Sequence, residues 1–210
     1  MQFRGYHLFI ILLRGNKIFS LDIETLGVES TSVILSIGIL YISDTRTRSY
    51  QDVLENSIFI KINAKDQIEN YKRTVDKNTI EWWKKQGDLQ RKYSYVPSPR
   101  DVSVTQAIKM CRNWVNSQEN TKAMVWTRGS MDSSCLDSLF KAAGEDELFP
   151  YNQYRDVRTA IDLIYPNTSK NGYVEVDQDK CPGFSFDLVL KHHPVHDSAA
   201  DICMLLYGKE

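Results

Sequence analysis

Cysteine is scarce in this sequence, and its positions are far apart. Four cysteines occur in 210 residues with no Cys-x-x-Cys pair among them, at Cys111, Cys135, Cys181 and Cys203. Disulfide frameworks are typical of small secreted chains with many cysteines. The spacing therefore argues against such a framework, and we expect four reduced thiols in an intracellular, cytoplasmic protein.

Neither charge is in excess, and no apolar run is long. Lys and Arg number 26 against 27 Asp and Glu, which excludes the global basic field that drives indiscriminate nucleic-acid binding. The apolar run at residues 7–13 is too short to span a bilayer, and no small-residue cleavage site follows it. We interpret residues 1–16 as an N-terminal extension of uncertain role, or an extra edge strand, and residues 17–210 as one domain.

Helical and strand patterns alternate along the chain without internal repeats. Strands are expected over residues 17–23, 33–42, 57–62, 123–127 and 154–157, with the first two forming a hairpin. Helices are expected over residues 79–86, 104–115, 133–143, 159–164 and 198–207, and residues 165–186 read as one irregular stretch. This order predicts an α/β fold with a mixed sheet flanked by helices.

An apolar strand ends on two carboxylates, Asp22 and Glu24. Burying two negative charges is costly unless a cation or another strong partner neutralises them. Side chains two residues apart on a strand face the same side, so both carboxylates can bind one ion together. The pattern predicts a metal site at the end of this strand.

Two later segments carry further acidic residues. Asp132 stands where a predicted strand gives way to a helix, at the sheet edge where ligands usually bind. Asp201 falls in the last predicted helix, five residues after His196. If both were helical they would point about 140° apart. We therefore expect Pro194 to keep His196 in the preceding loop, with Asp197 or Ser198 capping the helix.

The ordered set of motifs resembles the DEDDh 3′ to 5′ exonucleases of the ribonuclease H-like superfamily. It consists of an Asp-x-Glu strand, a second Asp after a strand, and His-x-x-x-x-Asp near the end. More narrowly, it is similar to the exonuclease A group of T-even phages and the bacterial exoribonucleases grouped with it. The narrower matches are Thr-Ile-Glu-Trp-Trp at 79–83, Arg-Asp-Val-Arg-Thr at 155–159 and His-Asp-x-Ala-x-Asp at 196–201.

The resemblance implies a site and a reaction. It implies a mixed five-stranded sheet of the ribonuclease H-like kind, and a catalytic set in which four carboxylates hold two divalent cations, Mg²⁺ or Mn²⁺, and a histidine acts as general base. The matching carboxylates are Asp22, Glu24, Asp132 and Asp201, and the matching histidine is His196. Two such cations would clamp the scissile phosphate, and hydrolysis would release nucleoside 5′-monophosphates from a free 3′ end.

Some residues offer competing assignments. His192 stands five residues before Asp197 and repeats the His-x-x-x-x-Asp spacing, but Pro194 lies inside that frame, so we read His192 as a loop residue. The family usually has Phe before its second Asp, where this chain has Met131, and Asp137 is nearby. We keep Asp132 as the ligand and expect Asp137 on a solvated helix face.

Four further residues are candidates for substrate contacts: Trp82, Trp83, Arg128 and His193. A tryptophan can stack on a terminal base. Adjacent helix positions point about 100° apart, so core packing is the better interpretation for the tryptophan pair together.

The leading functional hypothesis is a 3′ to 5′ exonuclease on single-stranded DNA, in a host cytoplasm if a phage encodes it. The first alternative is an exoribonuclease trimming RNA 3′ ends, because the same site can run both reactions and recognition of the 2′-OH decides between them. The second is an inactive nucleic-acid-binding or protein-interaction module on the same fold. A homodimer is an expectation from family analogy alone.

Overall fold

The computed structural model describes residues 17–43, 49–165, 168–169 and 171–209. Five strands form one mixed sheet in the order β3-β2-β1-β4-β5, which confirms the predicted fold class. The strands are β1 (Ile18–Thr25), β2 (Ile34–Ile42), β3 (Ser57–Lys61), β4 (Met124–Thr127) and β5 (Tyr154–Asp156). The interpretation of residues 1–16 falls outside the described residues.

The central strand β1 has neighbours of both directions. It pairs antiparallel with β2 as the predicted hairpin, and parallel with β4, which in turn pairs parallel with β5. The carboxyl ends of β1, β4 and β5 therefore meet at one edge of the sheet. In open α/β sheets this edge is where ligands bind.

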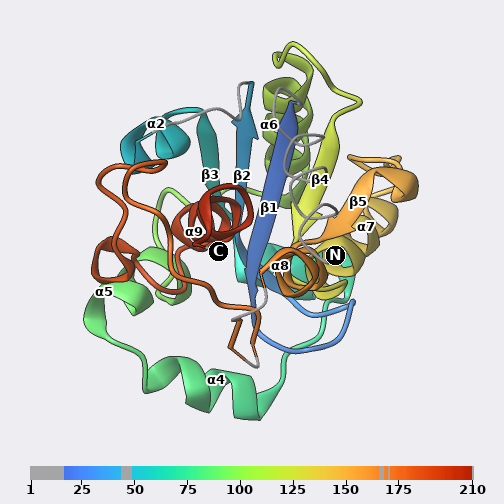
Figure 1. The fold of residues 1–210 in the computed structure, drawn as a ribbon. Helices are drawn as coiled ribbons and strands as arrows, with labels where there is room; N and C mark the ends of the chain where they lie inside the picture. The colour runs from blue at the N-terminus through green and yellow to red at the C-terminus, as the bar shows by residue number, and fades with distance from the viewer. Residues whose placement is uncertain (1–16, 44–48, 166–167, 170, 210) are drawn as a thin grey trace.

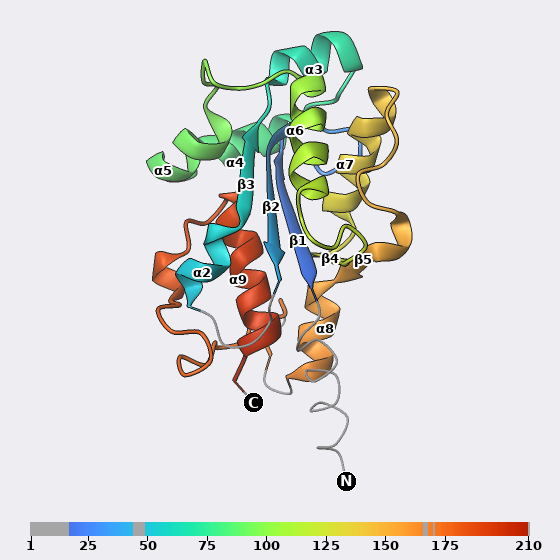
Figure 2. The same cartoon turned by 90° about the horizontal axis from the view of Figure 1, so that it is seen from above.

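Helices cover both faces of the sheet (Figures 1 and 2). One face packs against α6 (Val104–Asn116) and α7 (Met131–Ala142), and the other against α8 (Val157–Ile164) and α9 (Pro194–Tyr207). Successive side chains of β1 point to opposite faces of the sheet. Phe19 and Leu21 pack in the core under α6 and α7, and Ile18 packs in the core under α8 and α9. The even-numbered side chains of β1 therefore face α9.

The remaining elements are short, and the sequence patterns did not reveal all of them. They are α2 (Tyr50–Glu55), α3 (Ala64–Tyr71), α4 (Lys77–Lys84), α5 (Asp88–Gln90), the π-helical turn η1 (Arg91–Tyr95) and the 3₁₀ turns η2 (Tyr151–Gln153) and η3 (Phe186–Leu188). Helices α2 and α3 begin at the side-chain caps Ser49 and Asn63. Among the described residues, no helix is long and apolar enough to cross a membrane.

Helices α7 and α9 begin earlier than the sequence predicted. Asp132 is consequently the second residue of α7 rather than part of the connection before it. Helix α9 begins at Pro194, because proline is well suited to the first helical position, where its missing N–H costs nothing. The prediction that Pro194 keeps His196 in a loop is therefore wrong, and His196 and Asp201 are both helical.

The first turn of α9 lies directly against β2 at Gly38, the residue that pairs with Asp22 across the hairpin. A Cβ atom added at Gly38 would come within 2.5 Å of the backbone C of Pro194 and the backbone N of Val195. Only a residue without a side chain permits this approach. Gly38 thus sets how closely the acidic residues of α9 come to those of β1.

We expect Gly38→Ala to destabilise the protein by about 1–3 kcal/mol, the usual cost of forcing extra volume into a packed interface. Urea denaturation measures the change. Ser36→Ala is the matched control, because Ser36 is two residues away on the same face of β2, is fully buried, and has a hydroxyl without a hydrogen-bond partner among the described residues. Equal stability of Gly38→Ala and the unmodified protein would contradict the close packing of α9 on β2.

Candidate active site

Strand β1 presents Asp22 and Glu24 on the face covered by α9. Three more carboxylates come from the helices around them: Asp132 from the first turn of α7, and Asp197 and Asp201 from α9. Asp132 and Asp201 are buried, with 7% and 9% of their surface exposed. We call these five residues the acidic cup. The cup contains all four carboxylates that the sequence analysis selected, together with Asp197, which it did not.

The carboxylates of the cup raise one another's pKa values. Burial, followed by the charges of Asp132, Glu24, Asp197 and Asp201, raises the pKa of Asp22 well above its ordinary value. The pKa of Asp132 rises to about 7, chiefly through burial and then through Asp201. A buried carboxyl group surrounded by like charges resists ionisation. This electrostatic cost marks the cup as a place for cations.

Burial and neighbouring carboxylates also raise the pKa values of Glu24 and Asp197. Burial raises the pKa of Glu24 strongly, and the charge of Asp197 is the next largest cause. The pKa of Asp197 rises to about 7 through burial, although the backbone N–H of His192 opposes the shift. That N–H donates to Oδ2 of Asp197 at 2.7 Å.

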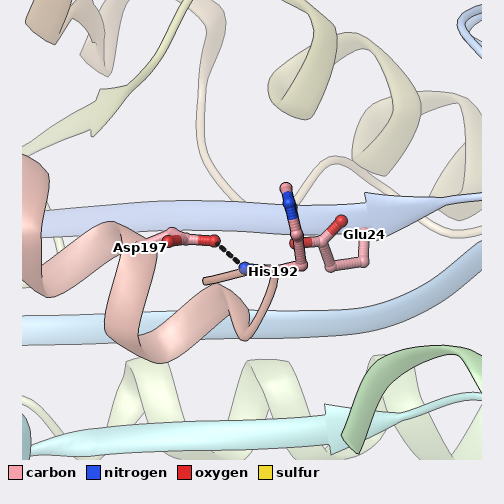
Figure 3. A group of neighbouring side chains, drawn as sticks. All are labelled: Glu24, His192 and Asp197. Atoms are coloured by element: carbon pink, nitrogen blue, oxygen red, sulfur yellow. Dashed lines mark hydrogen bonds and ion pairs between the residues drawn. The ribbon is translucent and has the colours of Figure 1, made fainter. Parts of the chain in front are cut away.

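His192 completes a possible metal-binding group with these two acids (Figure 3). One ligand atom from each of Glu24, His192 and Asp197 lies within 4.8 Å of the others. Nδ1 of His192 is 3.8 Å from Oε1 of Glu24. From the sequence, Asp197 or Ser198 is expected to cap the helix, and Asp197 is not selected as a ligand. The spacing of four residues between Asp197 and Asp201 is the sequence signal that could have placed Asp197 in the cup, because helical residues four apart share a face.

A cavity of about 700 Å³ opens onto the cup. Asp22, Glu24 and Asp201 line part of it, and residues of the segment 171–191 form another wall. That wall carries two partly exposed aromatic residues, Tyr173 and Phe186, whose ring centroids are 6.1 Å apart. The site therefore combines a group of carboxylates with a wall that carries aromatic side chains.

Arg128, at the end of β4, is bound to Asp201. Its Nε atom donates to both carboxylate oxygens at 2.9 and 3.1 Å, and its Nη2 atom donates to Oδ1 at 2.6 Å. Burial raises the pKa of Asp201, and the hydrogen bonds from Arg128 act against that rise. Arg128 thus lines the cavity, in keeping with its selection as a candidate substrate contact, although its partner here is a carboxylate.

The structure places His196 away from the cup. Nδ1 of His196 lies 3.2 Å from the hydroxyl of Tyr50 in α2, on the side of α9 that faces α2. His196 and Asp201 are both helical and five residues apart, so their side chains point about 140° apart. They therefore cannot reach the same site in this conformation. The histidine that lines the cavity is instead His192.

The other substrate candidates divide between core and surface. Trp83 is fully buried, and its Nε1 atom donates to the carbonyl oxygen of Thr25 at 2.9 Å. Trp82 is 42% exposed, with its ring centroid 4.8 Å from that of His192. His193 stacks on Phe59 at 4.4 Å and does not line the cavity. Of the tryptophan pair, only Trp82 is accessible.

Asp137 differs from its expected position on a solvated face. It is half-buried, and it accepts a hydrogen bond from the hydroxyl of Tyr154 at 3.3 Å. Burial raises the pKa of Asp137 to about 6. Apart from burial, the groups that shift its pKa are Tyr154 and Glu147 and none of the five cup acids, so we place Asp137 outside the acidic cup although it shares a helix with Asp132.

The sequence and the fold both match known nucleases. Residues 17–205 match the family described as the 3′-5′ exoribonuclease Rv2179c-like domain. An exodeoxyribonuclease of Enterobacteria phage T4 is 27% identical over 210 aligned positions, which cover 90% of this chain and 88% of the phage protein.

Solved nuclease structures share the fold. E. coli exonuclease I in a zinc-bound complex with single-stranded DNA superposes with a TM-score of 0.57 at 9% identity, covering 92% of this chain and 40% of that one. Cell-death related nuclease 4 gives a TM-score of 0.55 at 13% identity, covering 91% and 62%. The chain thus spans about two fifths of exonuclease I. The protein belongs to the 3′-5′ exoribonuclease Rv2179c-like family and is a 3′-5′ exonuclease.

Proposed function

We propose that this exonuclease is metal-dependent and removes nucleotides from the 3′ end of single-stranded DNA, releasing nucleoside 5′-monophosphates. The observation that carries the proposal is that Asp22, Glu24 and Asp201 line one cavity, while the buried Asp132 is close enough for its charge to raise the pKa of Asp22. The phage T4 relative, which aligns over most of both chains, is named an exodeoxyribonuclease. The buried free thiols fit a reducing compartment, so we place the activity in the cytoplasm.

The cup fits divalent cations of the hard, oxygen-preferring kind. Its donors are carboxylate oxygens, which suit Mg²⁺ and Mn²⁺. Their mutual repulsion is relieved when positive charge enters. We assign two ions to Asp22, Glu24, Asp132 and Asp201, with Asp197 as a fifth carboxylate at the side of Glu24. When bound, such ions activate water and stabilise the leaving 3′ oxygen.

We assign the general base to His196, on the strength of its match to the family motif. In the described conformation its ring is bound to Tyr50, so it reaches the cup only if the first turn of α9 opens. Two features weaken that turn. The capping residue His193 makes no side-chain cap hydrogen bond. His192, just before it, has a φ of 60°, a strained value for a residue other than glycine.

His192 is the second candidate for the base, and a specific observation favours it. It already lines the cavity with Nδ1 3.8 Å from Glu24. Burial lowers the pKa of His192, which keeps the ring neutral and able to accept a proton near pH 7. The two assignments require opposite outcomes from single substitutions.

The RNA alternative rests on the description of the matched family as exoribonucleases. We favour DNA because the aligned phage relative is named for DNA, and because one solved exonuclease I structure of the same fold holds a dT13 oligonucleotide. A non-catalytic binding module is disfavoured, because a cup of mutually repelling carboxylates destabilises a scaffold that holds no cation.

The substrate is tested with 3′- and 5′-labelled DNA and RNA oligonucleotides of the same sequence, in Mg²⁺, Mn²⁺ or EDTA. We expect a ladder that shortens from the 3′ end, a higher kcat/KM for DNA, and no products in EDTA. A higher kcat/KM for RNA would establish the exoribonuclease alternative. Binding without cleavage in either metal would establish the inactive module, and unchanged cleavage in EDTA would refute the metal mechanism.

We expect Asp22→Asn to abolish cleavage and to remove the rise in melting temperature that Mn²⁺ gives by binding the folded state. In EDTA the variant should melt at the same temperature as the unmodified protein or slightly higher, because one repelling charge is gone. Asp137→Asn is the matched control, a half-buried acid outside the cup that should keep both the Mn²⁺ shift and the activity. An undiminished Mn²⁺ shift in Asp22→Asn would contradict the assignment.

His196→Asn and His192→Asn decide between the two bases. We expect His196→Asn to lower kcat by about 10²- to 10⁴-fold, the usual contribution of a general base, with Mn²⁺ affinity nearly unchanged. His192→Asn should retain most of kcat. The reverse pattern would transfer the role to His192, and matched losses of kcat and Mn²⁺ affinity would make the affected histidine a metal ligand.

A further inference from the structure

Arg128 occupies the part of the cup that the proposed function gives to a cation. Both oxygens of Asp201 accept hydrogen bonds from its guanidinium, and the two side chains are only 15% and 12% exposed. A carboxylate gripped in this two-point geometry has few lone pairs left for a metal ion. Arginine and metal therefore compete for Asp201.

We propose that Arg128 is a metal-displaced phosphate clamp. It neutralises Asp201 while the cup is empty of cations, and it turns toward the scissile phosphate of the nucleic acid when cations take its place. The proposal deepens the proposed function and rests on it. The ligand class is a phosphodiester, which the planar guanidinium recognises with two parallel hydrogen bonds.

A second set of contacts gives Arg128 an anchor that does not involve Asp201. Its Nη1 atom donates to the carbonyl oxygen of Asn171 at 2.7 Å, and its guanidinium carbon lies 4.7 Å from the ring centroid of Tyr173. Both partners belong to the segment that forms the cavity wall. Rotation over the Tyr173 ring releases Asp201 while the head group stays at the cavity.

The charges of the cup supply the reason for the exchange. A divalent cation brings twice the charge of a guanidinium to a group of repelling carboxylates, so it is the stronger partner for Asp201. The displaced Arg128 keeps its positive charge beside the cavity. It therefore adds attraction for a phosphate at the stage when the cations are in place, and not before.

The first test is isothermal titration of Mn²⁺ into the protein without nucleic acid. We expect Arg128→Gln to bind Mn²⁺ more tightly, by about three- to tenfold, because a competing charge-assisted ion pair is gone. Arg128→Lys keeps a competing charge and should lie between. Arg158→Gln is the control for charge alone, because Arg158 is exposed and influences Asp201 only through its charge.

The second test measures binding of a fluorescent phosphorothioate DNA oligonucleotide, which resists cleavage, by anisotropy. Adding Mn²⁺ should strengthen binding by the unmodified protein, and Arg128→Gln and Arg128→Lys should both lose most of that gain. Weaker Mn²⁺ binding by Arg128→Gln, with a lower melting temperature in EDTA, would show that Arg128 merely positions Asp201 and would overturn the proposal.

Failure of the proposed function looks different. If the unmodified protein neither binds Mn²⁺ nor cleaves DNA, the metal mechanism fails and the clamp fails with it. If the unmodified protein does both while Arg128→Gln shows unchanged Mn²⁺ affinity and an undiminished Mn²⁺ gain in oligonucleotide binding, the clamp alone is rejected.

Discussion

The mutual repulsion of the carboxylates gathered around the carboxyl end of β1 is the constraint that the rest of the structure must satisfy. Three elements bring Asp22, Asp132 and Asp201 close together: the charges of Asp132 and Asp201 raise the pKa of Asp22, and the charge of Asp201 raises that of Asp132. Apolar packing must hold them together. The odd-numbered residues of β1, Phe19 and Leu21, provide part of it by anchoring the strand in the opposite core.

The packing of α9 against the sheet holds its two acids close to β1 despite their charge. Gly38 lets the helix approach β2, and the hydroxyl of Ser198, next to Asp197 and three residues before Asp201, donates to that of Ser20 at 2.7 Å. The same helix buries its apolar residues against α8 and the sheet. Core burial on this face is thus what keeps Asp197 and Asp201 next to β1 in spite of their charge.

The sequence predicted the sheet and the carboxylates better than it predicted the histidine. Alternation and strand ends placed Asp22, Glu24 and Asp132 at the correct edge, because these depend on local period and on the parallel neighbours of β1. The start of α9 was predicted too late, because a proline can either block a helix that would begin before it or serve as the first helical residue itself. In this chain Pro194 does the second. The Arg128 ion pair joins residues 73 apart, and no local pattern encodes such a contact.

The first turn of α9 links these observations. Asp197 is tied through its carboxylate to the backbone of His192, and His196 is tied to Tyr50 on the other side of the same turn. Opening the turn would therefore free a carboxylate and a histidine together. Under the proposed assignments, Asp197 and Asp201 would help hold cations on one side of α9, while the proposed base lies on the other side. Both the cation site and the position of His196 therefore depend on how α9 begins.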